Sequence, residues 1–174
     1  MTGQRRPSVC AENAPGSLPS VNPLLTRASR GAAWGAIATV PMSAVMLAGQ
    51  QLGWMKEQPP EALTEEALRR VELLEENSVE TAHSLAVASH FAFGAACGAL
   101  YALLGRAAPN AVAVPTGIAF GLGIWGASYR GWIPAMHILP LDQHPGRRGT
   151  VVMIAAHAVY GASLGALRWK SPQR

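Results

Sequence analysis

The sequence has few charges, few cysteines and none of the common catalytic motifs. Only 14% of its 174 residues are charged, whereas a typical soluble domain has about 25%. Two cysteines are too few for a disulfide framework or a multi-cysteine zinc or iron–sulfur site. HExxH and P-loop motifs are also missing. We therefore predict a protein that is not an enzyme, binds no cofactor and has no nucleic-acid partner.

Long stretches without any charge are the main feature that is present. They cover residues 31–55, 81–105, 107–129 and 149–167. A helix needs about 20 mainly apolar residues to cross a bilayer, and a helix in a soluble bundle normally keeps a charged face. We therefore predict an all-α integral membrane protein, with a lipid bilayer as its surroundings. The expected membrane domain covers residues 29–170, with four transmembrane helices at about 31–55, 81–105, 110–130 and 149–168.

The segments outside these helices differ in charge. Residues 1–28 contain no hydrophobic run, so we expect a disordered basic tail and no cleaved signal peptide. The loop 56–80 carries eight of the ten acidic residues and predicts an amphipathic helix on the outer surface. The loop 131–148 contains prolines and histidines, and we expect it to lie at the interface or to re-enter the membrane.

The distribution of Lys and Arg predicts the orientation of the chain. Basic residues next to the helix ends are concentrated on the side that carries both termini, and cytoplasmic loops are usually enriched in Lys and Arg. We therefore expect a multi-pass protein of the bacterial inner membrane with both termini inside. The cations that favour this orientation are Arg27, Arg30, Arg106, Arg168 and Lys170.

An internal repeat relates the two halves of the sequence. Residues 90–100 align with residues 157–167, with six of eleven positions identical, and residues 31–35 align more weakly with 117–121. This pattern predicts two repeated helical hairpins related by an axis along the membrane normal. Glycines four residues apart let helices approach closely. The candidate packing residues are Gly31, Gly35, Gly94, Gly98, Gly117, Gly121, Gly161 and Gly165.

These glycines also suggest which helices pack together. We expect the second and fourth helices to pack through Gly94/Gly98 and Gly161/Gly165, either within one chain or between chains. Packing between chains would make the protein a homo-oligomer or give it a partner in a membrane complex.

The five histidines are the most distinctive chemical feature, and in this topology all lie toward the outer side. Three interpretations remain open. The rings could hydrogen-bond backbone groups across helices and fix the packing, they could respond to the pH outside the membrane, or His90 and His157 could hold a metal or haem. The candidate residues are His83, His90, His137, His144 and His157.

Several short motifs resemble the YagU-like family of small bacterial inner-membrane proteins. They are Pro59–Pro60 before the acidic loop, His90-x-x-Phe-Gly, Gly121 followed by Trp125, the Trp-Ile-Pro-Ala run at 132–135, and His157-x-x-Tyr-Gly. The resemblance extends over about residues 30–168. It implies a multi-spanning membrane protein without an assigned activity, and it carries over no catalytic residues.

The functional expectation is therefore broad. We expect a non-enzymatic inner-membrane protein of envelope or stress physiology with pH-responsive outer histidines. A small solute or ion transporter or channel is one alternative, because the hairpins are duplicated. A His-ligated haem or metal protein of electron transfer is the other.

Overall fold

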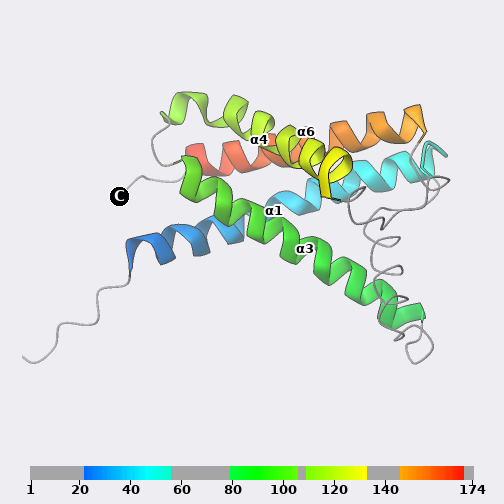
Figure 1. Cartoon of the computed structure of the whole chain (residues 1–174), viewed down its shortest axis with the longest axis horizontal. Helices are drawn as coiled ribbons and strands as arrows, with labels where there is room; N and C mark the ends of the chain where they lie inside the picture. The colour runs from blue at the N-terminus through cyan, green and yellow to red at the C-terminus, as the bar shows by residue number, and fades with distance from the viewer. Residues whose placement is uncertain (1–21, 56–78, 106–108, 133–145, 171–174) are drawn as a thin grey trace, which may run out of the picture.

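The computed structural model describes residues 22–55, 79–105, 109–132 and 146–170, and its described part is all-α, as predicted (Figure 1). The long helices are α1 (Pro23–Gln51), α3 (Val79–Leu104), α4 (Ala113–Ala127) and α6 (Arg147–Lys170). A short 3₁₀ helix, η2 (Asn110–Val112), precedes α4, and a π-helical segment, η3 (Ser128–Trp132), follows it.

Local sequence signals set both ends of α1. The side chain of Asn22 accepts a hydrogen bond of 2.9 Å from the backbone N–H of Leu24, and a proline occupies the first helical position. At the other end Gly53 has a φ of 69°, and the N–H groups of Gly53 and Trp54 donate to the carbonyls of Gln50 and Gly49. This is a Schellman arrangement, which needs a residue such as glycine in the left-handed region.

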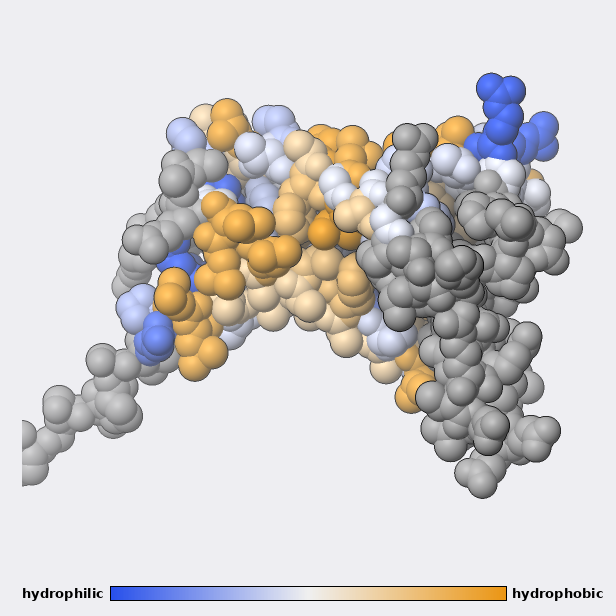
Figure 2. All heavy atoms as spheres, in the orientation of Figure 1, coloured by the Kyte–Doolittle hydropathy of each residue, from blue (hydrophilic) through white to orange (hydrophobic). Residues whose placement is uncertain are grey.

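Three of the helices are long and apolar enough to cross a membrane. They are Pro23–Gln51, His83–Leu104 and Arg147–Lys170, whereas α4 alone is a shorter apolar helix of 15 residues. Figure 2 shows hydrophobic residues over the middle of the molecule and hydrophilic residues toward its ends. The chain therefore has the helices of a membrane protein, in agreement with the coarse prediction.

Consecutive helices run antiparallel and form two pairs (Figure 1). Helix α1 packs along α3, α4 packs along α6, and contact between α1 and α6 joins the pairs. The core lies at this junction and includes Met46, Met153, Ala156, Tyr160 and Leu164. We call the surface where the α1/α3 pair meets the α4/α6 pair the seam.

The observed helix bounds extend beyond the charge-free stretches. Helix α1 begins eight residues earlier than expected, because the Asn22 cap and Pro23 start it within the segment assigned to the tail. Helix α6 includes Arg147 and Arg148 at its start and Lys170 at its end. Residues 1–21 of the tail, 56–78 of the acidic loop and 133–145 of the third loop lie outside the described residues.

The two helix pairs do not dock as a symmetric dimer of hairpins. A two-fold axis would bring α3 against α4 as closely as α1 against α6, but the backbone contact between the pairs is made by α1 and α6. Repeat-equivalent residues also differ in environment, since Tyr160 is 3% exposed and Phe93 is 47% exposed. The expected symmetry axis is therefore wrong for the docking of the two pairs within this chain.

Candidate functional site at the seam

Four glycines form the crossing between α1 and α3. A Cβ atom placed on Gly35 would collide with the carbonyl oxygen of Gly94, and one on Gly98 with that of Gly31. A Cβ atom on Gly94 would meet the hydroxyl of Thr39, which is itself fully buried and donates to the Gly35 carbonyl at 2.9 Å. Only glycine allows this approach of the two backbones.

The crossing between α4 and α6 is built in the same way. A Cβ atom on Gly117 would collide with the carbonyl oxygen of Gly161, and the converse also holds. Gly121 faces the carbonyl of His157, and Gly165 faces that of Ala113. Each helix pair therefore has its own glycine crossing.

These contacts correct the expected pairing of the glycines. Gly94 and Gly98 of α3 face α1, while Gly161 and Gly165 of α6 face α4. Within the chain, α3 and α6 therefore do not pack glycine against glycine. The reason is geometric: each small face is already occupied by its sequence neighbour in the hairpin, and the larger side chains on the next face fill the seam.

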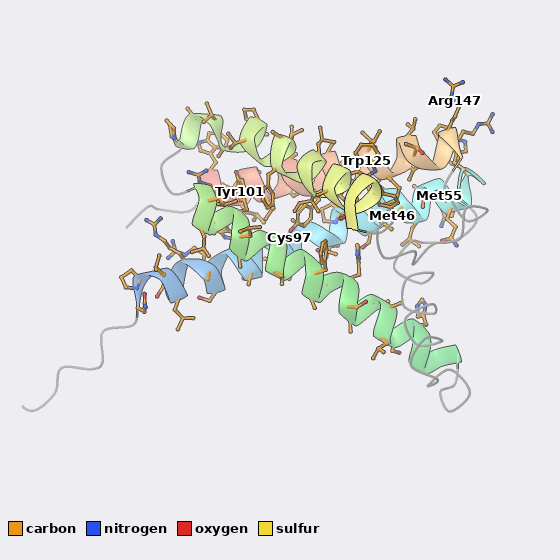
Figure 3. All side chains as sticks on the ribbon, in the orientation of Figure 1. Met46, Met55, Cys97, Tyr101, Trp125 and Arg147 are labelled. Atoms are coloured by element: carbon orange, nitrogen blue, oxygen red, sulfur yellow. The ribbon has the colours of Figure 1, made fainter. Side chains whose placement is uncertain are left out.

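Two tyrosines link the helix pairs across the seam. The hydroxyl of Tyr160 on α6 donates a buried hydrogen bond of 2.6 Å to the carbonyl of Gly94 on α3. The hydroxyl of Tyr101 on α3 donates at 2.8 Å to the carbonyl of Ala113, at the start of α4. The Tyr101 ring also packs against Phe120, with ring centroids 5.2 Å apart. Figure 3 shows Tyr101 and Cys97 on α3 and Trp125 and Met46 along the same interior.

An arginine closes the seam at the end where α6 finishes. Arg168 is 4% exposed, and its Nη2 donates at 2.5 Å to the carbonyl of Gly105 just after α3. Its guanidinium carbon lies 5.9 Å from the centroid of the Tyr101 ring, within the range of a cation–π contact. A buried cation is thus held by a backbone carbonyl and an aromatic face.

His157 is the most buried of the described histidines. Its Nδ1 donates to the Met153 carbonyl at 2.8 Å, because a carbonyl oxygen can only accept. This bond lies within α6, so the packing interpretation is wrong in expecting this nitrogen to bond across helices. The cause is the four-residue spacing, which brings the ring onto the carbonyl one turn earlier.

His90 on α3 and His157 on α6 each lie about one turn before the residues that the Tyr160–Gly94 hydrogen bond joins, and the two helices run in the same direction (Figure 1). The His90 ring stands edge-on to Phe91, and its Nε2 is buried without a hydrogen-bond partner among the described residues. His83 is exposed and lies closer to the start of the same helix. His137 and His144 lie outside the described residues. The structure therefore brings together two of the five candidate histidines.

The seam has a limited range of chemistry. Within the ranges that the structure describes, no group of three or more His, Cys, Asp or Glu residues gathers as a metal centre would require. Cys97 is a buried free thiol in the same core. The hydrogen bonds of the seam fix one helix pair on the other.

Sequence reasoning overlooked the residues that link the pairs. In the sequence, Tyr160 belongs to the His157-x-x-Tyr-Gly motif and Arg168 is one of the cations that predict the orientation. Nothing there indicates partners for their polar groups or for the Tyr101 hydroxyl. One signal was present, since Tyr160 occupies the repeat position of Phe93 and adds a hydroxyl there. A hydroxyl gained at a membrane-embedded position needs a partner.

Comparison with known families assigns no activity to the chain. Residues 25–170 match a family of unknown function, DUF6789. The chain belongs to this family. No curated protein and no solved structure gives a significant match. The DUF6789 match includes nearly all of the described helices, and it agrees with the expectation of a family without an assigned activity. The YagU-like resemblance and the bacterial origin stay predictions.

Proposed function

We propose that this DUF6789 chain is a non-enzymatic, four-span membrane protein whose two hairpins dock through a proton-responsive seam. The fourth span would consist of η2, α4 and η3, which together cover residues 110–132. At 1.5 Å per residue this run is about 34 Å long, enough for a hydrocarbon core of about 30 Å. The antiparallel order of the helices also suits an even number of spans.

The proposed orientation keeps both termini on the cytoplasmic side of a bacterial inner membrane. Arg27 and Arg30 lie near the start of α1, and Arg168 and Lys170 lie near the end of α6. The opposite end has Arg147 and Arg148 at the start of α6. Residues 56–80, which follow α1 at that end, carry most of the acidic residues. Positive charge at the cytoplasmic ends of spans supports this orientation.

The two glycine crossings support a duplicated hairpin. In both pairs, glycines four residues apart on one helix meet glycines four residues apart on the next. The sequence repeat relates the same positions. The two copies differ at seam positions, since Tyr160 corresponds to Phe93 and Arg168 to Tyr101.

The proton response rests on one observation: two imidazoles lie about one turn from the Tyr160–Gly94 hydrogen bond that joins the helix pairs, and His90 has a buried nitrogen without a partner among the described residues. A second positive charge close to the first would be repelled, and both would lose hydration inside the bundle. Acidification should therefore weaken the docking of the hairpins. On the packed helices, the other titratable or charged side chains that lie in or against the buried core are Cys97, Tyr101, Tyr129, Tyr160 and Arg168.

The test is the thermal stability of the full chain in lipid nanodiscs between pH 7.5 and pH 5. For each proton taken up on unfolding, stability falls by about 1.4 kcal/mol for every unit by which the pH decreases, which corresponds to roughly 3–6 °C in Tm. We expect this slope of Tm against pH in the wild type, and we expect the double variant His90→Gln/His157→Gln to lose it. The control His83→Gln, at an exposed position on α3, should keep it.

An unchanged pH slope in the double variant would contradict the proposal. The single variant His90→Gln guards against a folding defect, since His157 alone makes the hydrogen bond within α6. It should fold and show a reduced slope. A role in envelope or stress physiology stays a prediction beyond this test.

A further inference from the structure

The end of the bundle where α1 begins and α6 finishes carries a concentration of positive charge. Arg27 and Arg30 come from α1, and Arg168 and Lys170 from α6. The sequence next to these helix ends contains further cations. Eight of the ten acidic residues belong to residues 56–80, which connect the end of α1 to the start of α3 at the other end of the bundle. We call the four described cations the basic end.

The helix contacts bring these cations to one place. The C-terminal part of α3 is the common neighbour, because Gly31 of α1 packs against Ala102 and Arg168 of α6 bonds to Gly105. Arg27 precedes Gly31 by about one turn, or roughly 6 Å along the axis. The cations of α1 and α6 therefore flank the same helix end.

Arg168 lies just beneath this surface, because it is 4% exposed and its guanidinium bonds to the Gly105 carbonyl and lies over the Tyr101 ring. It adds positive charge there, whereas Arg30 and Lys170 are exposed and can contact a phosphate directly. The ring of Trp169 beside Arg168 is 62% exposed, and tryptophan favours the headgroup zone of a bilayer.

We propose that the basic end binds the phosphate headgroup of an anionic phospholipid, such as phosphatidylglycerol. Charge complementarity favours an anionic lipid over a zwitterionic one, and the exposed apolar residues next to the cations, Leu24, Leu25 and Trp169, suit the acyl region of the same molecule. This inference shares only the membrane location with the proposed function. It does not depend on the response of the histidines to protons.

The test is the stabilisation of the purified full chain by short-chain lipids in mild detergent at pH 7.5. Dioctanoyl phosphatidylglycerol should raise Tm saturably, by roughly 5–10 °C at about 100 times its Kd. Dioctanoyl phosphatidylcholine and inorganic phosphate at the same concentrations should raise it far less. Equal stabilisation by phosphatidylcholine would overturn the proposal, and equal stabilisation by inorganic phosphate would replace the lipid with a free anion.

A matched pair of variants locates the site. Arg30→Gln/Lys170→Gln removes two exposed charges at the basic end, and Arg147→Gln/Arg148→Gln removes two exposed charges at the other end of the bundle. Each Lys or Arg near an anionic surface contributes about five-fold in affinity. The first variant should bind phosphatidylglycerol roughly 25-fold more weakly, with the second unchanged. An equal loss in both variants would contradict a site at the basic end.

Because all of these measurements are made at one pH, their failure would leave the proton response untouched. Conversely, loss of the pH slope in the histidine variants has no bearing on lipid binding.

Discussion

Replacing Gly121 with alanine should disrupt the α4/α6 crossing, although the change adds only one methyl group. The new Cβ would collide with the His157 carbonyl oxygen and lie 3.1 Å and 3.2 Å from the backbone N and Cα of Gly161. All three neighbours are backbone atoms, so no side chain can rotate away. The two helices would have to separate, and they would lose the close contact along the whole crossing.

The size of the effect follows from known overpacking costs. Extra methyl groups in a packed interior cost typically 1–3 kcal/mol. For a chain of this length, 1 kcal/mol corresponds to roughly 2–4 °C in Tm. We therefore expect Gly121→Ala to lower Tm by roughly 2–12 °C, and a larger residue at this position to lower it further.

The same helix provides a matched control. A Cβ atom on Gly123 meets no atom of the described residues within 4 Å. Gly123→Ala has the same gain in intrinsic helix propensity as Gly121→Ala, so the difference between the two variants isolates the crossing. Thermal unfolding in detergent, followed by circular dichroism, measures it. Equal Tm values for the two variants would refute the reasoning that these glycines allow backbone contact.

Two further variants probe the seam. Tyr160→Phe removes the hydrogen bond to Gly94 and should lower the free energy of unfolding by about 0.6 kcal/mol, and by at most about 1.7 kcal/mol, because these are the mean and the largest values measured for such bonds in a helical membrane protein. Unfolding in denaturant measures this difference, and an unchanged value would place the hydroxyl outside the stabilising contacts. In a Cys10→Ser background, Cys97 should react with a maleimide slowly in the folded chain and rapidly after unfolding, because it is buried in the core. Fast labelling of the folded chain would contradict the packing of α3 against the seam.

The helical architecture could be predicted because its cause is local. Long intervals without charge mark helices for an apolar solvent, and Asn22 and Pro23 start α1 by a short-range signal. The glycine spacing likewise indicates close packing, because glycines four residues apart share one helix face. None of these features requires knowledge of which helix is the neighbour.

The choice of partner could not be predicted, because it depends on the whole set of side chains. The glycine faces of α3 and α6 look equivalent in sequence, yet each packs on its own hairpin partner. Similarly, His90 and His157 are equivalent in the repeat, but only His157 bonds to a carbonyl one turn earlier in its helix among the described contacts. Tyr160 was identifiable only by comparison with Phe93, and its partner, a glycine carbonyl on α3, has no side-chain signal.

The number of spans is the most direct test of the account. Single cysteines at Ser29 and Lys170, placed near the start of α1 and the end of α6 in a chain without Cys10 and Cys97, can be labelled by a membrane-impermeant maleimide in sealed vesicles of known orientation. Four spans predict that both positions label from the same, cytoplasmic side. Labelling from opposite sides would mean an odd number of spans, and it would contradict the pair of docked hairpins.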